Sequence, residues 1–196
     1  MREGDKQMSS TRNTLVRSMH DVGVAAWFGG SLMGAVALNG ASGDIADPAD
    51  RTRVASAGWA RWSPVAFAAI GSHVIGGIGL IVANRGRIER QSGVGTNTVV
   101  KSVLTGLAVG STVYSGLLGA KVLKAGPVPA ESGTSPSSAT PADVARNQQQ
   151  LRVLQWVTPV LTGLLVILGA QQGEQQRPSQ VASGVARKVG VRARRR

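Results

Sequence analysis

The chain has 196 residues, with 22 Lys and Arg against 10 Asp and Glu, and it has no cysteine. The missing thiol excludes a disulfide framework, a thiolate metal site and an iron–sulfur cluster. The length excludes a large α/β barrel. Only 16% of the residues are charged, against roughly 25% in ordinary soluble domains. The net charge of +12 therefore reflects scarce acids rather than abundant charge.

Four long runs without a formal charge follow one another along the chain. They contain 17, 22, 19 and 18 residues and cover 22–38, 62–83, 102–120 and 153–170. A bilayer core needs about 20 apolar residues as helix, and backbone that faces lipid must be helical. The alternative, a soluble bundle, is disfavoured because none of the runs has a charged face. The fold class that we expect is all-α, an integral membrane four-helix bundle.

The runs divide the chain into three expected parts. These are a cytoplasmic N-terminal segment over 1–14, a transmembrane domain over 15–170 and a basic cytoplasmic tail over 171–196. Within the domain we predict helices at about 15–39, 62–84, 99–123 and 152–170. Ala35-Val36-Ala37 resembles a signal-peptide cleavage pattern. The segment before it is long and contains acids, which favours a retained signal-anchor helix.

Small residues recur at four-residue spacing within the first three runs. In a bilayer such residues let helix backbones approach closely. The pattern leaves open whether these faces pack inside one bundle or dock a protein partner or a second copy. The glycines that we expect in helix packing are Gly30, Gly34, Gly76, Gly106 and Gly110.

Two connecting segments are expected on the outer side. Residues 125–150 contain four prolines among Ser, Thr, Ala and Gly and no aromatic residue. We expect a flexible outer linker that buries no core, in which 142–152 can extend the last helix. The connection over 39–61 carries three Asp residues and is expected to be a solvated loop.

Charge asymmetry predicts the orientation. With both termini in the cytoplasm, 15 basic residues lie inside and 7 lie outside, so the positive-inside rule favours this topology in a plasma membrane. The segment Trp62-Ser63-Pro64-Val65 is echoed by Trp156-Val157-Thr158-Pro159-Val160. Both Trp–Pro pairs lie at the predicted outer interface, where Trp suits the headgroup level and proline is tolerated in the first helical turn. The echo suggests two hairpins related as a parallel repeat.

The C-terminal tail ends in a run of basic residues. Such a run next to a membrane helix gains about 1 kcal/mol per residue from anionic lipid. Nucleic acid also attracts it, but no aromatic residues are interleaved to stack on bases. We therefore expect anionic lipid as the partner and disfavour nucleic acid. The basic residues concerned are Arg187, Lys188, Arg192, Arg194, Arg195 and Arg196.

The two histidines of the chain, His20 and His73, are the candidates for intramembrane chemistry. We expect His73 to face the bundle interior and bond to Ser72, Tyr114 or a backbone carbonyl. The alternatives are a haem or metal ligand and a proton-pathway residue. His20 is expected to be an interfacial polar residue at a helix N-terminus. At 1.5 Å per residue the two histidines come out at depths about 7–15 Å apart, which argues against one haem held by both.

A family resemblance rests on the stretch His20-Asp21-Val22-Gly23-Val24-Ala25-Ala26-Trp27-Phe28-Gly29-Gly30-Ser31-Leu32-Met33-Gly34, followed by a second helix with His73. It resembles uncharacterised four-helix membrane proteins of actinobacteria over most of 14–170. The His, then Trp-Phe-Gly spacing also resembles the copper-resistance CopD-like and DUF4149-like membrane families over the first two helices. The resemblance implies a plasma-membrane bundle with a link to haem or copper. The further histidine and methionine ligands that copper handling needs are absent from this sequence.

These observations favour a non-enzymatic structural or partner subunit of the cell envelope, without a cofactor. One alternative is a redox membrane protein associated with haem b or a metal through His73 and His20. Another is a small, holin-like permeability protein. The small-residue faces would serve a protein partner or a homo-oligomer in any of these roles.

Overall fold

The structure is a computed structural model, which describes residues 3–90 and 94–174 of the chain. The elements in this part are helical and are joined by short turns and one longer connection. In chain order they are α1 (Glu3–Met33), the π-helical η1 (Gly34–Leu38), α2 (Asn39–Ala41), the 3-10 helix η2 (Ser42–Asp44), α3 (Pro48–Arg90), α4 (Val94–Lys124) and α5 (Ala142–Glu174).

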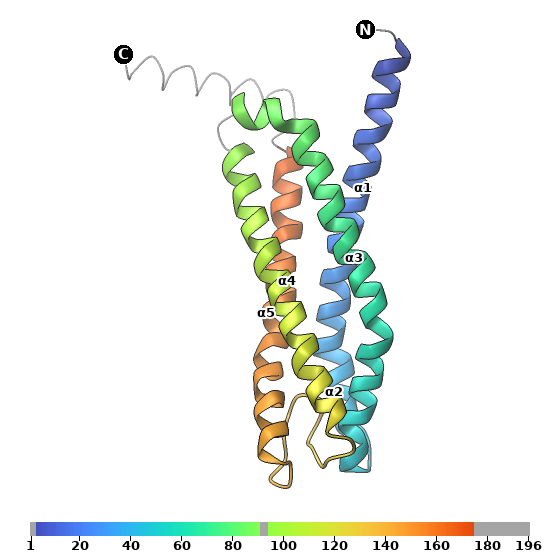
Figure 1. The fold of residues 1–196 in the computed structure, drawn as a ribbon, viewed down its shortest axis with the longest axis vertical. Coiled ribbons are helices and arrows are strands. Elements are labelled where there is room, and N and C mark those ends of the chain that lie inside the picture. The colour runs from blue at the N-terminus through green and yellow to red at the C-terminus, as the bar shows by residue number, and fades with distance from the viewer. Residues whose placement is uncertain (1–2, 91–93, 175–196) are drawn as a thin grey trace, which may run out of the picture.

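The four long helices form an up-down-up-down bundle (Figure 1). α1 packs against α3 as one antiparallel hairpin and α4 packs against α5 as the other, while α1–α5 and α3–α4 contacts close the bundle. In Figure 1, α1 and α4 begin at the upper end, and α3 and α5 finish there. η2 and the connection between α4 and α5 lie at the lower end.

Four helical stretches of the described residues are long and apolar enough to cross a membrane, and the first of them runs from α1 through η2. These stretches are Thr14–Asp44, Pro48–Arg85, Gly95–Lys124 and Ala142–Gln171. Large apolar side chains such as Phe67, Ile75 and Leu107 point outward from the bundle. An apolar surface on all sides suits hydrocarbon and not water. The protein is therefore a multi-pass membrane protein, and the predicted all-α four-helix fold is confirmed.

The helices extend beyond the uncharged runs that predict them. α4 begins at Val94, before its predicted start at 99. α3 begins at Pro48, so the expected solvated loop over 39–61 is wrong. Pro64 and Pro159 lie inside α3 and α5 rather than in their first turns. The physical reason is that an uncharged run measures only the hydrocarbon layer. A helix continues past that layer, with polar side chains that water or headgroups solvate.

The connection between α4 and α5 also differs from the prediction. Val128 packs with Val122 and Val144 in a small buried cluster. The N–H of Gly133 donates to Ser42 Oγ at 2.7 Å, and Gln148 Nε2 donates to the Ser132 carbonyl at 3.1 Å. The expectation that 125–150 buries no core is therefore wrong. α5 begins at Ala142, which confirms that 142–152 extends the last helix, and the residues before it pack against the lower end of the bundle.

The predicted packing glycines fall into two groups. A Cβ at Gly76 would lie 2.5 Å from the backbone of α1, and Gly30 and Gly34 lie against the indoles of Trp62 and Trp59. These glycines let α1 and α3 approach closely. At Gly106 and Gly110 of α4, by contrast, a Cβ would meet no atom within 4 Å. Gly106 and Gly110 therefore face away from the other helices of this chain.

A buried layer crosses the middle of the bundle. Trp27 of α1, 1% exposed, packs with Ala69 of α3 and Ala108 of α4. The Trp27 indole N–H donates to Thr112 Oγ1 at 3.1 Å. Since Trp27 is the largest side chain in this layer, it separates the interior of the upper half from that of the lower half.

Two sequence expectations lie beyond these observations. The two-hairpin arrangement that a parallel repeat needs is present, while the duplication itself stays a prediction. The basic residues Arg187 to Arg196 of the expected tail lie outside the described residues.

Candidate functional site

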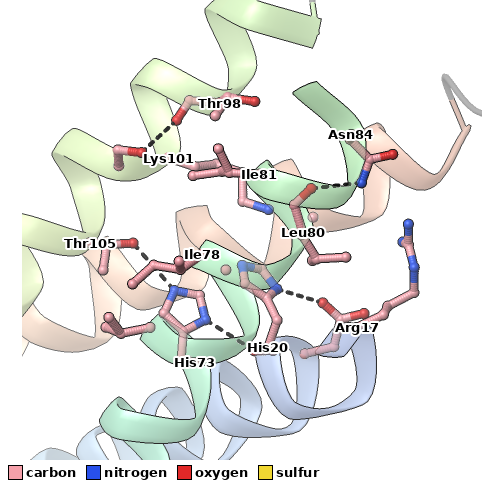
Figure 2. Close-up of a pocket in the computed structure, with 15 residues that line it drawn as sticks. Arg17, His20, His73, Ile78, Leu80, Ile81, Asn84, Thr98, Lys101 and Thr105 are labelled. Carbon is pink, nitrogen blue, oxygen red and sulfur yellow. Dashed lines mark hydrogen bonds and ion pairs between the residues drawn. The ribbon is translucent and has the colours of Figure 1, made fainter. Parts of the chain in front are cut away.

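The two histidines, which the depth count placed far apart, lie side by side in the upper half of the bundle (Figure 2). Their ring centres are 4.2 Å apart and the rings are tilted by 37°. The predicted difference in depth is wrong because both helices are longer than expected. His20 lies 17 residues after Glu3, where α1 begins, and His73 lies 17 residues before Arg90, where α3 ends. In an antiparallel pair these positions are level.

The close approach of α1 and α3 holds the pair together. A Cβ at Gly23 would lie 2.6 Å from His73 N, and one at Gly76 would lie 2.5 Å from His20 N. Each histidine thus lies opposite a glycine of the other helix. His20 is 5% exposed and His73 is 2% exposed. The expectation of His20 as an interfacial residue at a helix N-terminus is therefore wrong.

Hydrogen bonds assign the same tautomer to both rings. His20 Nδ1 lies 2.8 Å from Asp21 Oδ1, and His73 Nδ1 lies 3.0 Å from the His20 carbonyl oxygen. Both partners are acceptors, so each Nδ1 carries the proton and, in the neutral ring, each Nε2 presents a lone pair. The backbone carbonyl is one of the three partners predicted for His73. Ser72 instead donates to the Met19 carbonyl, and Tyr114 to Gln150 Oε1.

The histidines line a cavity of about 210 Å³, which we call the histidine cavity. The rings lie on one wall, and the Thr105 hydroxyl of α4 lies 3.3 Å from His73 Nε2 (Figure 2). Charged and polar side chains from three helices line the same space. They are Arg17 and Asp21 of α1, Asn84 of α3, and Thr98, Lys101 and Ser102 of α4.

Sequence reasoning did not single out Lys101 or Arg17, although the predicted helices over 99–123 and 15–39 contain them. Both lie in helices and are only partly exposed. A helical period through 98–105 was the available signal, because Thr98, Lys101 and Thr105 share one face of a helix at spacings of three and four. The uncharged run begins only at Ser102, because Lys101 is charged. A search for uncharged runs therefore divides this helix face and does not detect it.

The geometry of the pair limits what it can hold. Two imidazoles on opposite sides of one haem iron keep their coordinating nitrogens about 4 Å apart, with the porphyrin plane between them. Ring centres 4.2 Å apart leave no space for that plane. In the described part of the chain, no three His, Cys, Asp or Glu side chains gather in a metal-binding group. The site is therefore a poor fit to a haem shared by both histidines.

The histidine cavity is instead rich in hydrogen-bond donors. Lys101 and Arg17 carry positive charge, and Asn84, Thr98, Ser102 and Thr105 bear further polar groups that can donate. Asp21 is the acidic side chain at the cavity, and it accepts from the His20 ring.

Comparison with known proteins does not add an assignment. No family model matches the chain, and neither a curated protein nor a solved structure shows significant similarity to it. The resemblance to actinobacterial and CopD-like membrane proteins therefore stays a prediction.

Proposed function

We propose that the protein is a non-enzymatic subunit of the cell envelope that binds an anionic, phosphate-type group in the histidine cavity. The observation that carries this proposal is the presence of Lys101 and Arg17 beside two buried histidines within membrane-spanning helices. Ionisable groups are costly at such depth, and they are commonly found where a ligand or ion is handled.

The balance of charge favours an anion over a metal cation. Arg17 and Lys101 outnumber Asp21 among the lining residues. A phosphate oxygen accepts from Arg and Lys in charge-assisted bonds, and hydroxyls extend the donor set. A cation would instead meet two positive side chains at close range.

A lipid headgroup is the favoured source of the phosphate. Basic pockets between transmembrane helices on the cytoplasmic side bind anionic headgroups. The residues that line the histidine cavity belong to the upper half of the bundle, on the side where α1 begins, and this side is cytoplasmic in the predicted orientation. The same chemistry would accept a free phosphate, so the test has to separate the two sources.

The chain has two histidines, which makes them selective reporters. We would record ¹⁵N spectra of histidine-labelled full chain in nanodiscs of phosphatidylcholine, then with increasing phosphatidylglycerol. In parallel we would add inorganic phosphate to the phosphatidylcholine sample. We expect phosphatidylglycerol to shift both Nε2 signals saturably. A shift by inorganic phosphate alone would make the ligand a soluble anion.

Two substitutions on α4 provide the matched comparison. Lys101→Gln should weaken the response by at least about tenfold, because a charge-assisted hydrogen bond contributes about 1.5–3 kcal/mol. Lys121→Gln, near the other end of the same helix, should leave it unchanged. Identical spectra with and without both anions, or equal responses of the two variants, would refute the proposal.

A second candidate is a haem- or metal-associated redox protein. The observation in its favour is that both Nε2 atoms are free of the proton, as a metal ligand requires. An absorption spectrum of the purified chain from about 350 to 700 nm tests it. A Soret band that is lost in His73→Ala would favour this candidate over the anion site.

A further inference from the structure

A second cavity lies in the lower half of the bundle, on the other side of Trp27. Its volume is about 310 Å³, and we call it the tryptophan cavity. This volume is at the lower end of the range for small-molecule sites. Three indoles contribute to its wall, Trp27 from α1 and Trp59 and Trp62 from α3. The opposite wall belongs to α4, where three small residues line the space: Gly116, Gly119 and Ala120.

The polar groups of this cavity form a defined set. Trp59 Nε1 donates to Asn39 Oδ1 at 2.9 Å, and Asn39 Nδ2 donates to Gln155 Oε1 at 2.9 Å. These bonds hold α2, α3 and α5 together around the space. The Ser115 hydroxyl of α4 is buried and has no hydrogen-bond partner in the structure. A buried hydroxyl without a partner is unfavourable, so its rotation about χ1 toward a ligand oxygen in the adjacent space is favoured.

The charge of the occupant follows from the lining residues. None of the residues that line the tryptophan cavity is Asp, Glu, Lys, Arg or His. A charged ligand would be buried there without a counter-ion, which is strongly unfavourable. Indole faces favour flat or ring-shaped apolar groups. The space therefore suits an uncharged ring with one polar atom.

We propose that the tryptophan cavity binds a neutral, ring-containing amphipathic molecule whose hydroxyl or carbonyl oxygen bonds to Ser115. This site is separate from the histidine cavity and does not depend on what binds there. Trp27 contributes to the boundary between the two, because it lines the tryptophan cavity and its ring centre lies 6.3 Å from that of His73.

A series of four probes of similar size tests the proposal. Benzyl alcohol, toluene, benzoate and benzylammonium share one ring and differ in charge or in the polar atom. Three of the four tryptophans line the cavity, so intrinsic fluorescence of the full chain in nanodiscs reports occupancy. We expect saturable binding of benzyl alcohol and no saturable response to the two ions. Toluene should bind about threefold to tenfold more weakly, which is the effect of one neutral hydrogen bond.

Two variants separate binding in the cavity from partition into lipid. Gly119→Leu fills the space from a position where a Cβ meets no atom within 4 Å, and it should abolish saturable binding. Gly110→Leu, on the same helix but outside the cavity, should not. Ser115→Ala changes the cavity volume little and should lower the affinity for benzyl alcohol to that for toluene. Equal responses of Gly119→Leu and Gly110→Leu, or saturable binding of benzoate, would overturn the proposal.

Discussion

The histidine cavity and the tryptophan cavity lie in the same bundle and are built from the same four helices, but their chemistry is opposite. The first is lined by Arg17, Lys101 and Asp21, whereas no charged side chain lines the second. The difference shows that the two halves of one membrane domain have different solvation. The histidine cavity admits charged side chains, whereas the polar groups that line the tryptophan cavity are carboxamides, hydroxyls and indole N–H groups.

The two cavities also differ in what holds the helices apart. Around the histidine cavity, glycines bring the backbones of α1 and α3 into contact, and α4 stands across the space. Around the tryptophan cavity, the indoles of Trp59 and Trp62 fill the gap beside Gly34 and Gly30. Close backbone contact therefore positions the histidines, while large side chains shape the other site. Substitutions at these contacts should affect one cavity and spare the other.

The largest effect is expected at the boundary between them. Trp27→Ala removes a fully buried indole and should lower the free energy of unfolding by about 3–5 kcal/mol. It would also join the two cavities. Trp156→Ala is the control, because that side chain is 47% exposed and the change should be small. Reversible unfolding in detergent measures both, and similar losses would contradict the separating role of Trp27.

A smaller effect is expected at the α1–α3 contact. Gly76→Ala places a Cβ 2.5 Å from His20 N, and the helices must move apart at a cost of about 1–3 kcal/mol. Gly71→Ala on the same helix meets no atom within 4 Å and should be neutral. The ¹⁵N signals of the histidines should change in Gly76→Ala, with tryptophan emission unchanged. Stability equal to that of Gly71→Ala would show that the contact is not tight.

The smallest effect is expected at the lower end. Asn39→Ala removes the bonds to Gln155 and Trp59. Hydrogen bonds between membrane helices contribute about 0.6 kcal/mol on average and up to about 1.7 kcal/mol. We therefore expect a loss near 1 kcal/mol and a shift of tryptophan emission, with the histidine signals unmoved. If the histidine signals moved instead, the two halves would be coupled through the bundle.

The four-helix fold was predictable because lipid imposes one strong rule on long uncharged runs. The site was predictable only in part. His20 and His73 were identified as candidates, but their depths depended on helix ends that lie in polar sequence, where the rule does not apply. Lys101 was missed for the same reason. The packing of Val128 and Gln148 before and within α5 depends on partners distant in the chain, which composition does not reveal.

The π-helical segment η1 has a consequence for the register of the first helix. A wider turn adds one residue without adding a full turn of α-helix, so the residues that follow are rotated by about 100° relative to a regular helix. Asn39 follows η1 directly and is 4% exposed, with its amide against Gln155. Deleting one residue from η1 would restore a regular helix and turn Asn39 away from the interior. The single extra residue thus determines the direction in which Asn39 points, and with it the contact between this end of the first helix and α5.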